Sequence, residues 1–277
     1  MKSITIAKQE QLPALGQGTW YMGDSAASKK DEIASLRRGV ELGLKVIDTA
    51  EMYGSGKSER LVGEAIEPIR DEIFLVSKVL PYNASRSGTI EACEQSLKRL
   101  GTDHLDLYLL HWPGPNPLSE TIGAFEELQK AGKIRYWGVS NFDPNDMAEL
   151  LSTQGGERVA TNQVLYNLTR RGIEWDFLPQ SNADDMPIMA YSPIEQARLL
   201  KSKGLQKLAS DLGITAAQLA LAWLLTRKGV LAIPKAGTPA HVEQNAAALE
   251  IDLSEETLTE LDHLFPGPSG PIPLEIL

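Results

Sequence analysis

The sequence predicts a (β/α)8 barrel that forms a single domain over residues 1–277 and is preceded by a short N-terminal β-hairpin. The chain has 277 residues, close to the roughly 250 that such a barrel requires. Eight short apolar runs alternate with longer helical patterns, at 13–18, 44–49, 72–78, 105–111, 135–140, 160–166, 187–192 and 229–235. These runs are apolar on nearly every residue, as expected for parallel strands covered on both faces.

The main alternative is an open, doubly wound sheet. The stretch "GQGTWY" at Gly16 begins like a dinucleotide-binding glycine loop. It fails as that fingerprint because its sixth residue is Tyr21 and no helix follows directly. The barrel is therefore the preferred prediction.

The predicted elements carry local start and stop signals. The segment 1–16 alternates apolar and polar residues, which indicates the hairpin. Helices are expected to end at Gly43 and Gly229, and a short helical stretch is expected over 174–182. The Pro/Gly-rich tail 266–277 is predicted to be non-helical. Residues that can cap helix N-termini are Ser28, Ser58, Asp143, Thr215 and Ser254.

Composition excludes several classes of function. A net charge of −10 argues against binding nucleic acid, which requires basic surfaces. One cysteine, Cys93, permits no intrachain disulfide and fits a reducing compartment. There is no signal peptide pattern and no apolar run long enough to span a membrane. We therefore expect a cytoplasmic protein. A monomer is expected because the barrel buries its own core and no apolar surface stripe stands out, and no metal site is expected because the four histidines lack ligand spacing.

Four reactive side chains lie at or just after the ends of predicted strands. These are Asp48, Tyr53, Lys78 and His111. Each alone has an ordinary structural explanation, such as a turn residue or a core histidine. In a barrel, however, the carboxyl ends of the strands share one mouth, so the four are expected to meet there.

Together these four groups suit the reduction of a carbonyl. The tyrosine hydroxyl has an ordinary pKa of about 10, and a nearby lysine is expected to lower it. Asp48 would hold the lysine in place, and His111 would orient the carbonyl oxygen. Protein side chains have no hydride to give, so a nicotinamide cofactor is expected to supply it.

The sequence resembles the aldo-keto reductase superfamily over nearly its whole length. The motifs that carry the resemblance are "DTAEMYG", "LVSK", "LDLYLLHWP", "GKIRYWGVSNF" and "IPKAGTPAHVEQNAAAL". It implies that the four strand-end residues are catalytic. The implied cofactor-binding residues are Gly18, Thr19, Trp20, Ser140, Asn141, Gln163, Tyr191, Ser192, Pro193, Ile194, Lys235, Ala236, Gly237, His241, Gln244 and Asn245.

Within that resemblance, Lys235 would bind the 2′-phosphate of NADPH. Three positions depart from the usual pattern, namely Ala236, His241 and Gln244, and weaken the implied phosphate clamp. NADPH is the expected cofactor, with NADH use possible. The resemblance is strongest to small bacterial reductases of methylglyoxal and similar aldehydes, and Trp20 and Trp112 are expected to wall the substrate pocket.

Three other functions fit the sequence less well. A Schiff-base aldolase would need a neutral Lys78, whereas Asp48 would keep that lysine charged. A serine hydrolase would need a nucleophile elbow, but "GVSNF" ends in Phe142 instead of glycine. A cofactor-binding regulatory subunit is disfavoured because all four catalytic positions are filled.

Overall fold

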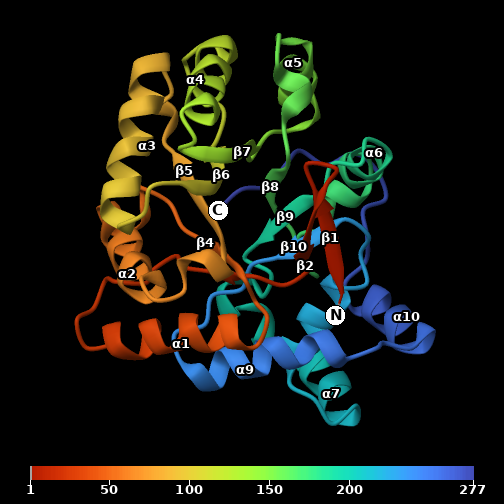
Figure 1. Ribbon diagram of the computed structural model, residues 1–277. Coiled ribbons are helices and arrows are strands. Elements are labelled where there is room, and N and C mark those ends of the chain that lie inside the picture. The colour runs from red at the N-terminus through yellow and green to blue at the C-terminus, as the bar shows by residue number, and fades with distance from the viewer. Residues whose placement is uncertain (1) are drawn as a thin grey trace.

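The structure, a computed structural model, describes residues 2–277 and contains an eight-stranded parallel sheet (Figure 1). Its strands are β3 (Gln17–Gly18), β4 (Val46–Asp48), β5 (Phe74–Val79), β6 (Leu105–Leu110), β7 (Ile134–Ser140), β8 (Asn162–Leu165), β9 (Ile188–Tyr191) and β10 (Val230–Ala232). They pair in chain order from β3 to β10. Parallel bridges join Leu15 to Ala232 and Gly18 to Lys235, so the sheet closes on itself. The predicted (β/α)8 barrel is confirmed.

Closure of the barrel depends on a close backbone approach at Gly18. Its N–H donates to the carbonyl oxygen of Pro234 at 3.0 Å. A Cβ atom at this position would lie 2.7 Å from the carbonyl oxygen of Ile233. Only glycine fits there without displacing the chain.

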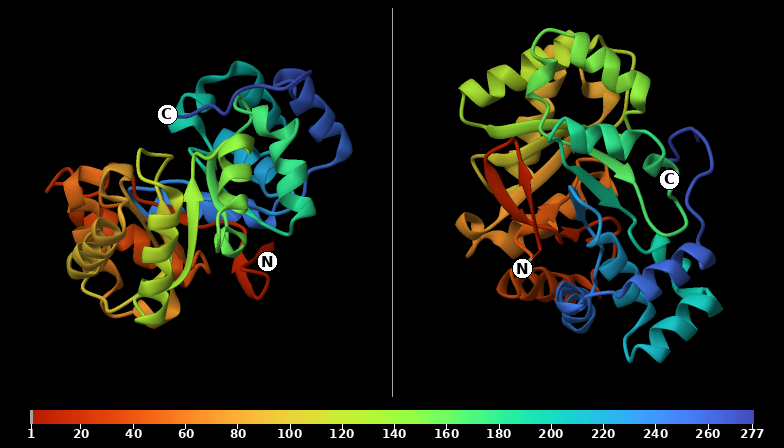
Figure 2. Two further views of the ribbon diagram at one scale, coloured as in Figure 1. Left: turned by 90° about the horizontal axis from the view of Figure 1, so that it is seen from above. Right: turned by 90° about the vertical axis from the view of Figure 1, so that its right-hand side faces the viewer.

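Helices surround the sheet (Figures 1 and 2). They are α1 (Lys29–Glu41), α2 (Lys57–Ile66), α3 (Arg86–Leu100), α4 (Leu118–Lys130), α5 (Pro144–Ser152), α6 (Phe177–Ala183), α7 (Lys203–Asp211), α8 (Ala216–Leu224), α9 (Pro239–Ala247) and α10 (Glu255–Leu264). Because helices cover the outer face of the strands and side chains fill the interior, every residue of β5 and β6 is buried. This double coverage explains the continuous apolar runs in the sequence.

The N-terminal hairpin is also confirmed. Its strands are β1 (Ser3–Ile6) and β2 (Glu10–Pro13), which pair antiparallel. Ala7 and Lys8 make the turn with positive φ angles of 50° and 59°. The hairpin shares a shallow cavity with Pro187 and with Gly229, which precede β9 and β10. It therefore lies at the amino ends of those strands, opposite the predicted catalytic rim.

Three of the five predicted helix caps are confirmed. The side chains of Asp143, Thr215 and Ser254 each accept a hydrogen bond from a backbone N–H in the first turn of α5, α8 and α10. The first two form full capping boxes, because the backbone N–H of the capping residue also donates to the side chain of the third helical residue. The tail after α10 is non-helical, as predicted.

Two predicted caps make no capping hydrogen bond, and one predicted helix end is wrong. Ser28 holds the N-cap position of α1, as predicted, but its hydroxyl donates to Glu32 at 3.0 Å and not to the helix backbone. Ser58 lies inside α2, buried, and its hydroxyl donates to Thr19 Oγ1 at 2.8 Å. Both hydroxyls find partners elsewhere, so neither serves an N-terminal N–H. Helix α8 ends at Leu224 and not at Gly229. The backbone N–H groups of Thr226 and Arg227 donate to the carbonyl oxygens three residues earlier, so a turn replaces the predicted last part of the helix.

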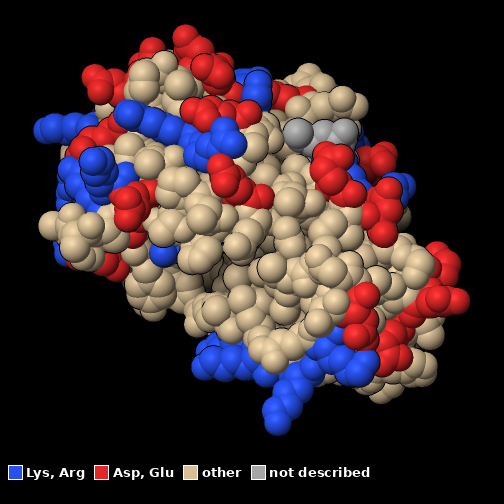
Figure 3. Space-filling view, turned by 90° about the horizontal axis from the view of Figure 1, so that it is seen from below, with Lys and Arg blue, Asp and Glu red and all other residues tan. Residues whose placement is uncertain are grey.

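Figure 3 shows the face that lies below in Figure 1, with basic and acidic side chains gathered around a hollowed and largely uncharged middle. Within residues 2–277, no helix has the length and apolar character needed to cross a membrane.

Candidate active site

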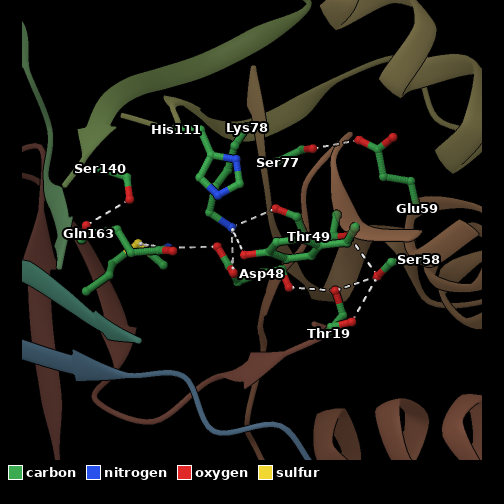
Figure 4. Close-up of polar contacts among 12 residues, drawn as sticks. Thr19, Asp48, Thr49, Ser58, Glu59, Ser77, Lys78, His111, Ser140 and Gln163 are labelled. Atoms are coloured by element: carbon green, nitrogen blue, oxygen red, sulfur yellow. Dashed lines mark hydrogen bonds and ion pairs between the residues drawn. The ribbon is translucent and has the colours of Figure 1, made fainter. Parts of the chain in front are cut away.

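The four predicted strand-end residues lie together at one rim of the barrel, where Figure 4 labels three of them. Asp48 ends β4, Lys78 lies near the end of β5, and His111 follows β6 directly. Tyr53 begins η1 (Tyr53–Gly56), a 3₁₀ turn in the loop after β4. Parallel pairing of β4, β5 and β6 brings these ends side by side.

The centre of the site is a buried ion pair. Lys78 Nζ donates to Asp48 Oδ2 at 2.8 Å and to the carbonyl oxygen of Thr49 at 2.9 Å. Lys78 is 0% exposed and Asp48 2%. The second carboxylate oxygen, Oδ1, accepts from Gln163 Nε2 at 2.8 Å. Each charge is therefore compensated by its partner and by further hydrogen bonds, which a buried pair requires.

Tyr53 provides the third acceptor for the lysine. Its hydroxyl oxygen lies 3.1 Å from Lys78 Nζ. The chain turns sharply after it, with φ of 55°, 53° and 81° at Gly54, Ser55 and Gly56. Glycine at two of these three positions makes the left-handed turn inexpensive. The turn lets helix α2 begin while the phenol stays over the ion pair.

Burial raises the pKa of Tyr53 above its ordinary value. Lys78 acts in the opposite direction and lowers it, as the sequence predicted, but Asp48 adds to the effect of burial. The predicted net lowering is therefore wrong for the described structure, because desolvation of the phenolate outweighs the ammonium. The hydroxyl keeps its proton at neutral pH and is available as a proton donor.

Lys78 remains charged. Burial alone would lower its pKa, but Asp48 and Tyr53 together raise it above the ordinary value. A lysine that holds its proton so firmly is a poor amine nucleophile. The charge instead stays beside the tyrosine hydroxyl, where it can stabilise a developing phenolate.

His111 is neutral. Burial, with a smaller contribution from Lys78, lowers its pKa from 6.5 to about 2. Its Nδ1 is buried and has no hydrogen-bond partner among the described residues. The single ring proton is therefore better placed on Nε2, since an unpaired donor would be left buried at Nδ1. The ring meets that of Tyr53 edge-on, with centroids 5.8 Å apart.

A small cavity of about 100 Å³ opens beside Tyr53 and His111. Its other lining residues are Trp20, Met52, Trp112, Ser140, Asn141, Gln163, Tyr191 and Leu277. Both predicted tryptophans thus lie in its wall. Its lining combines apolar side chains with the phenol, the imidazole and several amide and hydroxyl groups.

A longer groove of about 420 Å³ adjoins this cavity, and the two share Trp20, Tyr53 and Tyr191. Other predicted cofactor residues in its lining are Gly18, Thr19, Ser192, Pro193, Ile194 and Lys235. Lys235 therefore shares one concave surface with the catalytic tyrosine candidate. A larger hollow of about 750 Å³ lies near the hairpin turn, α5 and α6, but holds none of the strand-end residues.

Hydrogen bonds fix the polar groups where the cavity and groove meet. Tyr191 donates its hydroxyl proton to Asn141 Oδ1 at 2.8 Å. Asn141 Nδ2 donates to the carbonyl oxygen of His111 at 3.1 Å, and Ser140 Oγ donates to that of Gln163 at 2.8 Å. These contacts tie the ends of β6, β7, β8 and β9 together.

Five predicted cofactor residues lie outside the lining of both cavities. Ala236 and Gly237 follow Lys235, whereas His241, Gln244 and Asn245 lie on α9. Their assignment stays a prediction. Sequence reasoning also missed several lining residues, namely Tyr21, Met52, Gln196, Ala197, Ile233 and Leu277. Tyr21, Met52 and Ile233 lie inside the quoted sequence motifs, next to residues that were predicted, whereas no motif contains Gln196, Ala197 or Leu277.

The described part of the chain contains no candidate metal-binding site. Residues 2–277 contain no cluster of three or more histidine, cysteine, aspartate or glutamate side chains that could hold an ion. Cys93 is buried in α3, and its pKa is raised to about 12 by burial. It is a packing residue and not a reactive thiol.

Comparison with known proteins shows clear relatives. The profile of the Aldo/keto reductase family matches residues 14–265. A methylglyoxal reductase of Escherichia coli, YeaE, is 53% identical, with 100% of this chain and 99% of the relative covered. A glyoxal reductase of Bacillus subtilis is 33% identical, with 99% and 97% covered.

The fold is also similar to solved structures of aldo/keto reductases. An aldo/keto reductase from Klebsiella pneumoniae in complex with NADP and acetate superposes with a TM-score of 0.97. It is 51% identical, and the match covers 100% of this chain and 99% of that one. A second structure from the same organism, in complex with NADPH, gives the same TM-score and identity.

The low pKa of His111 predicts that the folded protein will not protonate this ring as the pH falls from neutral to mildly acidic values. The unfolded chain binds that proton near pH 6.5, whereas the folded chain does so only at about 2. The stability that this residue contributes is thus complete above pH 6.5 and is lost as the pH falls below it. NMR titration of the His111 ring, with the urea-unfolded protein as control, would show no inflection near 6.5 in the folded state. An inflection there would contradict the assignment.

The buried ion pair predicts a large stability loss for Asp48→Asn. Removing one partner leaves the Lys78 charge buried and uncompensated, which costs about 3–5 kcal/mol. Urea unfolding would measure the change. The matched control is Asp211→Asn, which removes the partner of Lys207 in an exposed pair and should alter stability little. Equal losses in the two variants would show that burial of the pair has no special role.

Proposed function

The chain belongs to the aldo/keto reductase family and is an oxidoreductase, and we propose that it reduces small aldehydes and dicarbonyls such as methylglyoxal with NADPH. One observation carries this proposal. The Tyr53 hydroxyl lies 3.1 Å from the Lys78 ammonium, in the wall of a cavity that the neutral His111 also lines. A protonated phenol, a fixed positive charge and a neutral imidazole are the groups that carbonyl reduction requires of the protein.

The chain's residues fit a nicotinamide dinucleotide. Tyr191 offers a flat aromatic face at the junction of the groove and the small cavity. Ser140, Asn141 and Gln163 supply the hydroxyl and amide groups that suit a carboxamide. Lys235 supplies a point charge for a phosphate. When bound, the cofactor supplies the hydride.

The protein's own residues govern the proton and the substrate. His111 directs its Nε2 proton toward the carbonyl oxygen and orients it beside the Tyr53 hydroxyl. Tyr53 then gives its proton to that oxygen as negative charge develops there. Lys78, held by Asp48, stabilises the phenolate that remains. Trp20 and Trp112 exclude water from one side of the reacting carbon.

The size of the cavity supports a small substrate. About 100 Å³ is available beside the tyrosine, far below the volume of a pocket for drug-sized ligands. The lining has no lysine or arginine side chain, so neutral aldehydes and dicarbonyls suit it better than carboxylates. The printed functions of two relatives, methylglyoxal reductase and glyoxal reductase, support the same class.

Two alternatives are weaker. An aldolase acting through a Schiff base would need an accessible neutral lysine, whereas Lys78 is fully buried with a raised pKa. A cofactor-binding regulatory subunit would not need a proton donor, yet Asp48, Tyr53 and His111 complete the site around that lysine.

Replacing the proton donor gives the most direct test. Tyr53→Phe should lower kcat/KM for methylglyoxal by about 10²–10⁴-fold, because the phenyl ring has no proton to give. NADPH binding, measured by fluorescence titration, should change little. The assay follows loss of the reduced nicotinamide's absorbance. Tyr82→Phe, at a tyrosine that is 78% exposed, is the control and should behave as wild type. Normal turnover by Tyr53→Phe would refute the mechanism.

The cofactor assignment predicts a selective effect at Lys235. Lys235→Met should raise the KM for NADPH about tenfold or more, because a charge-assisted contact with the 2′-phosphate is lost. The KM for NADH, which lacks that phosphate, should stay nearly constant. Lys228→Met removes the same charge from the opposite end of β10 and serves as the control. Faster turnover of the wild type with NADH than with NADPH would overturn the cofactor assignment.

A further inference from the structure

Arg170, in the loop after β8, joins two segments that are far apart in the sequence. Its Nε and Nη2 lie 3.2 and 3.0 Å from Glu195 Oε1, in the loop after β9. Its Nη1 lies 2.5 Å from Glu275 Oε1, in the tail after α10. One guanidinium therefore holds a carboxylate from the loop after β9 and another from the tail.

The first of these segments is a strained wall of the groove. Glu195, Gln196 and Ala197 all have positive φ angles, of 50°, 53° and 65°. Such a conformation is strained for a non-glycine residue and persists only where surrounding contacts enforce it. Gln196 and Ala197 line the groove, and Glu195 lies behind them, only 5% exposed.

The contacts that enforce this conformation converge on the Glu195 carboxylate. Besides Arg170, it accepts from Asn167 Nδ2 at 2.8 Å and from Arg198 Nη2 at 2.9 Å. Because two nitrogens of Arg170 contact one nearly buried oxygen, the orientation of the guanidinium is set by Glu195. An ordinary exposed ion pair lacks this constraint.

The second segment is the tail, which wraps from α10 past the loop after β8 to end over the barrel (Figures 1 and 2). It has no helix or strand of its own. Arg171 Nη1 holds its beginning through the carbonyl oxygen of Phe265 at 2.5 Å. Near its other end, Glu275 binds Arg170, and two residues later Leu277 lines the small cavity.

We propose that Arg170 is a positioning residue that couples the loop after β9, residues 192–198, to the tail. Through this coupling it sets the size of the carbonyl substrate that the cavity accepts. The inference rests on the proposed function. While residues 192–198 hold their conformation, Glu195 presents Arg170 to Glu275, and Leu277 stays in the cavity wall. A dinucleotide that contacts Gln196 and Ala197 would stabilise that arrangement, and by linkage the docked tail would favour dinucleotide binding.

The variant Glu275→Gln tests the coupling, because it keeps the shape of the side chain and removes the charge. The probes are methylglyoxal and phenylglyoxal, which share the dicarbonyl and differ in the size of the attached group. The ratio of kcat/KM for methylglyoxal to that for phenylglyoxal should fall about fivefold or more, mainly through a lower KM for phenylglyoxal. Arg170→Lys, which keeps the charge but not the two-nitrogen contact, should show a smaller fall.

Asp262→Asn is the matched control. It removes a carboxylate from the neighbouring Arg171, which keeps its contacts with Glu174 and Phe265. This variant should leave the ratio unchanged. If Asp262→Asn lowers the ratio as much as Glu275→Gln, the effect is a general loosening of the tail and the proposal for Arg170 is overturned.

Hydrogen exchange of the tail provides a readout independent of catalysis. NADPH should slow exchange at residues 274–277 in the wild type, and Glu275→Gln should abolish most of that slowing and speed exchange without cofactor. Unchanged exchange and an unchanged substrate ratio in the variant would refute the coupling. If the wild type reduced no carbonyl, the proposed function would fail, while the exchange measurements would still decide the coupling.

Discussion

The site depends on one constraint, which is that an ammonium group is held inside the barrel without exposed surface. Removing such a charge from water costs several kcal/mol, so Lys78 is stable only where acceptors surround it. Those acceptors are Asp48, the carbonyl of Thr49 and the hydroxyl of Tyr53. All three come from β4 and the loop after it. Burial of the Lys78 charge therefore requires both the register of β4 on β5 and the left-handed turn after Tyr53.

The charge also divides the roles of the two neighbouring groups. It is too weak to overcome the burial of Tyr53, so the phenol keeps its proton until a stronger base is present. In the proposed reaction, the alkoxide that forms as hydride reaches the carbonyl carbon is such a base. The same charge helps burial keep His111 neutral. The site thus has one permanent cation, one proton donor and one neutral hydrogen-bond donor, and their pKa values keep these roles distinct.

The sequence predicts the features that local pattern and topology determine. The strands were evident because burial on both faces leaves continuous apolar runs, and a parallel barrel then places Asp48, Lys78 and His111 at one rim. The sequence does not determine which partner a hydroxyl takes. The pattern around Ser58 predicts a helix cap, whereas packing in the folded chain directs its hydroxyl to Thr19. The tail has no periodicity, and the contact between Arg170 and Glu275 spans 105 residues, so nothing local indicated that Leu277 would line the cavity.

The two left-handed loops beside the site are stabilised in different ways. The loop that carries Tyr53 has glycine at two of its three positive-φ positions, so its shape costs little. The loop at 195–197 has no glycine there and relies on the ion pairs of Glu195. A proton donor must be held within a fraction of an ångström of its acceptor. The glycine-containing loop that carries Tyr53 provides such a fixed position. The contacts that hold residues 195–197 are also separate from those that hold Tyr53 over Lys78.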